Sequence, residues 1–301
     1  MPRAAAIAAA GAVVLAVTTA ALARQGVVAF ALYRGQEGGV DLGSWGSGSA
    51  AETDKTVLIG TRAIRITTQN LYAGGRILLK NPVDLSPAFA NPKTYLRMQM
   101  RFDTTQVTQR NSRDPFAQRT QSAPFDHMRF VLTMADGKQY ELTRPLVIPP
   151  TEDPDAYVPV SFPIAAILKK GDGTTAPVPT GDGAKVKEIS VFGDKYSQFT
   201  IGEIEVLTDD TEISVAALDE PIVFVNDQIT FTGSAEGGAS TLHYSWDFDA
   251  TDGIQEDAVG RTVTHVFRNA GKVTVTLTVT DADGIKAKDQ KSVTFDVTDT
   301  K

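Results

Sequence analysis

Short runs of alternating apolar and polar residues constrain the fold of this chain more than any other feature. Clear examples are residues 62–66, 95–102 and 128–132, and an alternation of period two puts the apolar side chains of a strand on one face. Gly, Pro, Asn and Asp occur between the runs and favour turns. The chain has no cysteine, which excludes disulfides, thiolate metal sites and cysteine nucleophiles. We therefore predict packed antiparallel sheets that are stabilised without covalent cross-links.

The acidic charge of the chain is concentrated in its last third. The net charge of the 301 residues is -7, but residues 24–210 hold 21 basic and 21 acidic side chains, whereas residues 211–301 hold 7 and 15. This change of composition predicts a domain boundary near residue 210. We expect one domain at residues 24–208 and a second at residues 209–301. Neither has the strongly basic surface that nucleic-acid binding requires, so no nucleic acid is expected as a partner.

The first residues of the chain predict an export signal. Arg3 precedes an apolar, Ala-rich run at residues 4–23, which ends in Ala-Leu-Ala before Arg24. These features are the charged start, the apolar stretch and the small-residue cleavage site of a secretory signal. We expect residues 1–23 to be a signal peptide and the protein to be extracellular or in the cell envelope. The alternative is an uncleaved anchor, since the apolar run is long enough to span a bilayer; only then would a membrane be a partner.

The strand runs after residue 210 carry a recognisable combination of motifs. Residues 244–249 read Tyr-Ser-Trp-Asp-Phe-Asp, residues 264–267 read Thr-His-Val-Phe, and residues 271–281 form a long run of Val and Thr. With these motifs, residues 213–297 resemble a PKD domain, which is an immunoglobulin-like β-sandwich. The resemblance implies a module that spaces or attaches extracellular parts and has no catalytic activity of its own.

Two polar features of this segment have alternative interpretations. Asp247, Asp249 and Asp252 offer carboxylates of the kind that calcium prefers. However, Asp247 alternates with Trp246 along a strand, so its carboxylate is expected to turn toward the adjoining loop, and we favour the structural interpretation. The resemblance places a structural histidine at His265, which we therefore do not expect to be catalytic.

The first domain holds about eight strand runs, whose order suggests a second resemblance. Trp-Gly-Ser-Gly-Ser at residues 45–49 and Tyr-Ala-Gly-Gly-Arg at residues 72–76 precede the run at 95–102, and residues 199–206 close the series. In this order the domain resembles the galactose-binding-like jelly rolls of carbohydrate-binding modules. The predicted fold class is all-β, with an N-terminal jelly-roll-like β-sandwich followed by an immunoglobulin-like (PKD) β-sandwich.

A sugar site in the first domain would require exposed aromatic rings and planar polar groups. Trp45, Tyr72 and Arg76 are the candidate ligand-binding residues, because all three lie in or beside Gly-rich segments. The alternative is that these aromatic rings pack over turns. Glu203 and Glu205 lie two residues apart and share a strand face, so they are candidate ligands of a structural calcium or, alternatively, part of a solvated edge.

The chain offers few of the groups on which enzymes rely. It has three histidines and no G-x-S-x-G or H-E-x-x-H motif. We therefore expect a secreted, non-catalytic protein with no cofactor beyond a possible calcium ion. The N-terminal sandwich is predicted to bind extracellular glycan or cell-surface material, with the PKD domain as a spacer. The alternative is a structural or adhesive envelope component that contacts a cell-surface protein or copies of itself.

Overall fold

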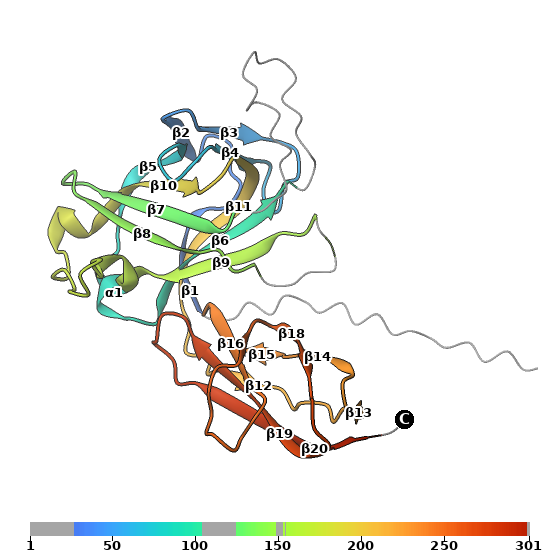
Figure 1. Cartoon of the computed structure of the whole chain (residues 1–301). Helices are drawn as coiled ribbons and strands as arrows, with labels where there is room; N and C mark the ends of the chain where they lie inside the picture. The colour runs from blue at the N-terminus through green and yellow to red at the C-terminus, as the bar shows by residue number, and fades with distance from the viewer. Residues whose placement is uncertain (1–26, 104–124, 149–152, 154, 300–301) are drawn as a thin grey trace, which may run out of the picture.

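The computed structural model describes residues 27–103, 125–148, 153 and 155–299. The predicted signal peptide at residues 1–23 lies outside this range. Within the described residues, no helix has the length and apolar content needed to cross a membrane. Figure 1 shows two groups of strands, the first running from blue to yellow and the second, C-terminal group from orange to red.

A six-stranded and a five-stranded sheet, both antiparallel, make up the first group. The six-stranded sheet has the order β3-β4-β11-β6-β9, with β1 paired to β11. Its strands are β1 (Val27–Tyr33), β3 (Ser49–Thr53), β4 (Ala63–Thr68), β6 (Thr94–Phe102), β9 (Val158–Pro163) and β11 (Ser197–Thr208). The five-stranded sheet has the order β2-β5-β10-β7-β8. Its strands are β2 (Val40–Trp45), β5 (Gly74–Asp84), β7 (His127–Met134), β8 (Gln139–Pro145) and β10 (Lys185–Gly193).

The core of this sandwich lies between the two sheets. It is filled by the apolar side chains of the alternating runs, including Ile64, Ile66, Ile77, Met98, Phe130, Ile189 and Ile201. Because the chain passes repeatedly from one sheet to the other, most neighbouring strands within a sheet are distant in sequence; β3–β4 and β7–β8 are the consecutive pairs. This arrangement confirms the predicted jelly-roll-like β-sandwich.

The second group of strands confirms the predicted immunoglobulin-like sandwich. A five-stranded sheet with the order β13-β20-β19-β16-β17 faces the pairs β12-β15 and β14-β18. The strands are β12 (Ser214–Val215), β13 (Val223–Phe224), β14 (Gln228–Thr232), β15 (Ala235–Glu236), β16 (Leu242–Asp247), β17 (Ala258–Val259), β18 (Thr262–Val266), β19 (Gly271–Asp281) and β20 (Asp289–Thr298). Trp246 is fully buried in its core, where its ring lies near those of Phe231 and Phe248.

Within the part of the chain that the structure describes, helical structure is confined to short segments. These are α1 (Ser86–Ala90) and two 3₁₀ turns, η1 (Ile164–Leu168) and η2 (Gly181–Ala184). The first 3₁₀ turn directly follows Pro163 and ends before Gly171. A five-residue helix such as α1 is too short to show a helical period in the sequence, so it was not predicted.

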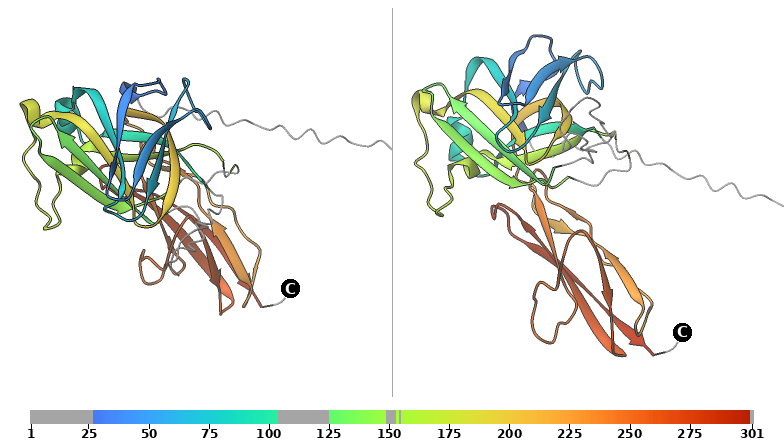
Figure 2. Two further views of the ribbon diagram at one scale, coloured as in Figure 1. Left: turned by 90° about the horizontal axis from the view of Figure 1, so that it is seen from above. Right: turned by 45° about the horizontal axis from the view of Figure 1, so that its top comes forward.

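A buried ion pair ties the segment that connects the two sandwiches to the second sandwich. The Asp209 carboxylate accepts hydrogen bonds from Lys286 Nζ at 2.7 Å, from the backbone N–H of Thr211 at 3.0 Å and from that of Ala239. Both charged side chains are almost fully buried. Tyr95 of the first sandwich also hydrogen-bonds Ser240 at 3.1 Å. The C-terminal strands extend from this joint in both views of Figure 2; the exact boundary at residues 208 and 209 stays a prediction.

Replacing Asp209 by Asn leaves the charge of Lys286 buried without its carboxylate. We expect Asp209→Asn to lower the free energy of unfolding by about 3–5 kcal/mol at pH 7, measured by urea denaturation. Burial alone would raise the pKa of Asp209, but the bonds from Lys286, Thr211 and Ala239 outweigh it and hold the pKa below its usual value. The stabilisation by the Asp209 carboxylate is therefore present at neutral pH and is lost as the pH falls through the folded-state pKa. The free energies of unfolding of the wild type and of Asp209→Asn should therefore become similar in acid.

Asp210 provides a control for this measurement. Its largely exposed carboxylate pairs with Lys93 at 3.0 Å, and exposed pairs contribute at most about 1 kcal/mol. Equal losses in Asp209→Asn and Asp210→Asn would contradict the role of the buried pair.

Candidate ligand-binding face

The outward face of the five-stranded sheet carries a cluster of rings and guanidinium groups. Ile77 and Phe130 point into the core, so their neighbours Arg76 and Arg129 point away from it. The strand register places Arg129 opposite Phe192 and Trp45 opposite Gly74. The Trp45 cluster, as we name it, consists of Trp45, Tyr72, Arg76, Arg129 and Phe192.

Glycines let the segments that carry Trp45 and Tyr72 come close together. A Cβ atom at Gly48 would lie 2.3 Å from the backbone nitrogen of Gly74, and one at Gly74 would lie 2.1 Å from the carbonyl oxygen of Val191. Larger residues at these positions would push the strands apart. The turn before Gly74 is fixed by Asn70, whose side-chain oxygen accepts a hydrogen bond from the Tyr72 N–H at 2.8 Å.

Arg76 is held beside Trp45 by a two-point ion pair. Its Nε and Nη2 atoms donate to the two oxygens of Glu188 at 2.8 and 2.6 Å, and its guanidinium lies 5.8 Å from the centre of the Trp45 ring. Ser190 donates a further hydrogen bond to Glu188 at 2.9 Å. Burial alone would raise the pKa of Glu188, but these bonds and the charge of Arg76 hold it below its usual value. Glu188 is therefore ionised at neutral pH and keeps Arg76 in place.

Arg129 lies between two aromatic rings. Its guanidinium carbon is 5.2 Å from the centre of the Tyr72 ring and 5.0 Å from that of Phe192. It also donates to the carbonyl oxygen of Leu71 at 3.1 Å and pairs with Glu141. Contacts of a cation with a ring at these distances contribute about 0.5–1 kcal/mol at exposed sites. Arg129 thus links the Tyr72 turn to the surface of the sheet.

The rings of the cluster differ in how much of them solvent can reach. Tyr72 is 72% exposed, Trp45 is half-buried, and Phe192 is fully buried. The Trp45 and Phe192 rings meet edge to face with their centres 5.7 Å apart. Phe192 is therefore the base of the cluster, and Tyr72 with part of Trp45 forms its accessible surface.

The three residues predicted as ligand-binding lie together in this cluster, but whether they bind a ligand stays a prediction. Sequence reasoning missed Arg129 and Phe192. Arg129 sits at an outward position of an alternating run, which is a signal for exposure. The contact of its guanidinium with the Tyr72 ring depends on a strand register that the sequence does not show.

Glu203 and Glu205 lie on the outward face of the other sheet. Glu203 accepts a hydrogen bond from Arg34 at 2.9 Å, and Glu205 pairs with Arg97 at 2.6 Å. Both carboxylates are buried in β11, an interior strand of its sheet, so the alternative of a solvated edge is wrong. Among the described residues, no group of three His, Asp or Glu side chains has a metal-binding arrangement. A calcium ion at Glu203 and Glu205 stays a prediction.

In the second sandwich, Asp247 and His265 have structural surroundings. The buried Asp247 carboxylate accepts hydrogen bonds from the backbone N–H groups of Asp249 and Gln255 at 2.8 and 3.0 Å, so it shapes the loop between them. His265 stacks on Phe248 with ring centres 4.0 Å apart, and burial lowers its pKa. These contacts agree with the structural interpretation of both residues.

Comparison with protein families decides the nature of the second sandwich. Residues 213–297 match the family model described as PKD domain. This segment is a PKD domain. The match includes Trp246 and Phe248 of its core as well as the Asp247 loop. No curated protein matches the chain.

Several solved structures are similar to the chain. A β-1,2-glucanase from Parabacteroides distasonis is 13% identical, with a TM-score of 0.37 over 91% of this chain and 39% of the glucanase chain. A family 30 carbohydrate-binding module of a cellulosomal cellulase from Clostridium thermocellum is 13% identical, with a TM-score of 0.36 over 60% of this chain and 98% of the module. A xylan-binding domain from Paenibacillus barcinonensis is 12% identical, with a TM-score of 0.32 over 63% of this chain and 99% of that domain.

The close approach at Gly74 can be tested by adding one methyl group. Because its Cβ would lie within 2.1 Å of Val191 and 2.9 Å of the Phe192 ring, we expect Gly74→Ala to lower the free energy of unfolding by about 1–3 kcal/mol. The matched control is Gly171→Ala, where a Cβ meets nothing within 4 Å. Thermal unfolding of the two variants measures the difference, and equal melting temperatures would contradict the tight packing under the cluster.

Proposed function

We propose that this protein is exported and binds extracellular glycan or cell-surface material through the Trp45 cluster. The observation that carries the proposal is the exposed Tyr72 ring beside Arg129, in one cluster with Trp45 and Arg76. A pyranose has an apolar C–H face that stacks on an aromatic ring and a rim of hydroxyl groups that need hydrogen-bond partners. The Tyr72 ring offers the first surface. Arg129 lies close enough to offer N–H donors beside it, and Arg76 can offer them beside the neighbouring Trp45 ring.

The arginines of the cluster are fixed before any ligand arrives. Arg76 is held by Glu188, and Arg129 by Glu141 and the carbonyl of Leu71. Fixed side chains lose little conformational entropy on binding, which favours affinity. Each arginine is also neutralised by a carboxylate, so the face presents donors without a large excess of positive charge. An uncharged polysaccharide suits such a surface better than a sulfated one.

We further propose that the cluster binds without hydrolysing its ligand. A glycosidase requires one protonated carboxylic acid with a raised pKa and a second carboxylate on the other side of the bond. The pKa of Glu188 is lowered by Arg76 and Ser190 in spite of burial, so this group cannot serve as the acid at neutral pH. The Glu141 carboxylate forms an ion pair with Arg129, which favours its ionised form over the protonated acid. The PKD domain would then act as a spacer that presents the sandwich.

Removal of the Tyr72 ring should weaken glycan binding. We expect Tyr72→Ala to reduce the affinity for an insoluble or immobilised polysaccharide retained by the wild type by about tenfold, the effect of losing one stacking surface. Tyr72→Phe is the matched control, because it keeps the ring and should keep the affinity. Pull-down on cellulose, xylan and β-1,3-glucan, followed by titration with the retained glycan, measures both variants.

The alternative function, adhesion through protein contacts, predicts a different pattern. If the protein retains no polysaccharide but attaches to cells or self-associates when purified, the adhesive proposal replaces the glycan proposal. Release of reducing sugar from a bound polysaccharide would contradict the non-catalytic role.

A further inference from the structure

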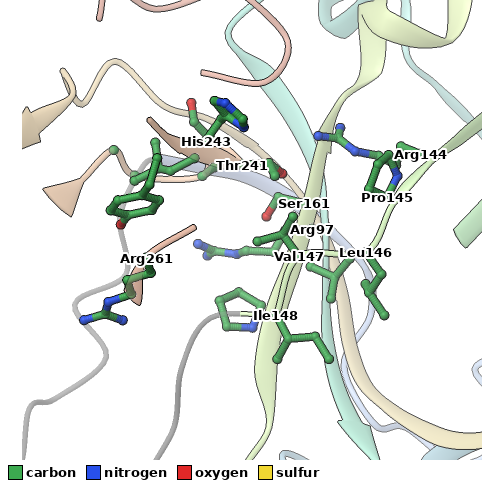
Figure 3. Close-up of a pocket in the computed structure, with 18 of the residues that line it drawn as sticks. Arg97, Arg144, Pro145, Leu146, Val147, Ile148, Ser161, Thr241, His243 and Arg261 are labelled. Atoms are coloured by element: carbon green, nitrogen blue, oxygen red, sulfur yellow. The ribbon is translucent and has the colours of Figure 1, made fainter. Parts of the chain in front are cut away.

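A cleft of about 580 Å³ lies between the sandwich and the PKD domain. It opens where β8 and β9, the edge strands of the two sheets, approach β15, β16 and β17 of the PKD domain. Figure 3 shows side chains of the two domains on opposite sides of it. Sites for small organic ligands commonly have about 300–1,000 Å³ and often occur at domain interfaces. None of the residues that line the cleft belongs to the Trp45 cluster.

The walls of the cleft are held in place by contacts between the domains. Arg144, in the sandwich wall, forms an ion pair with Asp283 of the PKD domain at 3.1 Å. The Tyr95–Ser240 bond also connects the domains, and the buried Asp209–Lys286 pair holds the connecting segment against the PKD domain. The site is therefore preformed, and little conformational entropy is lost in ordering it when a ligand binds.

The charges around the cleft are balanced. Arg97 is paired with Glu205 at 2.6 Å and Arg144 with Asp283. The remaining arginine and carboxylate of the lining, Arg261 and Glu236, add one charge of each sign. His243 lies 2.8 Å from the carboxylate of Glu256. No excess positive charge is left to complement an anionic ligand, so an uncharged ligand fits the site better.

The lining combines apolar walls with a few polar groups. Val147 of the sandwich and Val259 of the PKD domain are 50% and 54% exposed on the two sides. Polar side chains also line the cleft, namely those of Gln99, Ser161 and Thr241. Ser161 and Thr241 are labelled in Figure 3. Such a surface can cover the C–H face of a sugar while hydrogen-bonding its hydroxyl groups.

The strand edges at the cleft are poorly suited to an extended peptide. A peptide that adds to a sheet needs a row of free backbone donors along an edge strand. Proline lacks this donor. Pro159 lies within β9 and Pro145 is the last residue of β8, and both line the cleft. A peptide added as a further strand is therefore disfavoured.

We propose that this inter-domain cleft is a second ligand site, separate from the Trp45 cluster, and that it binds a neutral oligosaccharide between the two domains. The PKD domain then contributes residues to binding, through Thr241, Val259 and Arg261, in addition to spacing.

Blocking substitutions in the full-length protein test this proposal. The probes are cellohexaose, xylohexaose and laminarihexaose, with hexagalacturonate as the acidic comparison, titrated by calorimetry into Tyr72→Ala protein. We expect at least one neutral probe to bind, and Val147→Trp or Val259→Trp to weaken its binding about tenfold or more. Both positions are exposed, so the larger ring can be accommodated without unfolding. Val178→Trp is the matched control at 51% exposure outside the cleft.

The outcomes separate the two sites. Loss of all binding in Tyr72→Ala alone would overturn the cleft proposal and leave the Trp45 cluster as the glycan site. Wild-type affinity in Tyr72→Ala with loss in Val147→Trp would support the cleft and overturn the cluster. Binding that is unaffected by either cleft substitution, or binding of hexagalacturonate alone, would overturn the cleft proposal. A wild-type protein that binds none of the neutral probes would contradict both.

Discussion

The pleat of the β-strands determines both the core and the outward faces of this protein. At Arg76-Ile77 and at Arg129-Phe130, one residue enters the space between the sheets and its neighbour is turned to the other side. With no cysteine in the chain, this packing carries the stability of the sandwich. The core residues therefore also fix the positions of the arginines outside. A shift of register by one residue would destroy the core and the Trp45 cluster together.

Arginine–carboxylate pairs recur on the outward faces of both sheets. Arg76–Glu188 and Arg129–Glu141 lie on one face, and Arg97–Glu205 on the other. A buried pair adds little net stability compared with apolar residues of the same size, because both charges lose their hydration. Its effect is geometric, since each guanidinium has one favoured position against its carboxylate. The pairs thus give a protein without disulfides two faces on which polar groups are fixed.

The strands could be predicted from local patterns in the sequence. Contacts between residues that are distant in the sequence could be seen only in the structure. The alternating runs correspond to eight of the eleven strands among the described residues of the first sandwich. The other three lack that signal, since β1 is almost entirely apolar and β2 and β3 are rich in Gly, Ser and Ala. Glycines beside Trp45 and Tyr72 made these residues candidates, whereas the close approach of the backbones at Gly48 and Gly74 required the structure. The contact of Tyr72 with Arg129 depends on register, and the solvated-edge interpretation of Glu203 and Glu205 failed because sequence does not show which strand is central. The inter-domain cleft has no local signature in the sequence.

The joint between the domains bears on what the PKD domain does. A module that serves only as a spacer has to keep the neighbouring domain at a distance, and an exposed linker between the two is sufficient for that. Here the connecting segment is tied down by Asp209, whose carboxylate is fully buried against Lys286, and Arg144 reaches Asp283 across the boundary. Burying an ionised pair is costly unless its geometry is well satisfied. Such a joint restricts the orientation of the two domains, which is the condition for a site with one wall from each of them.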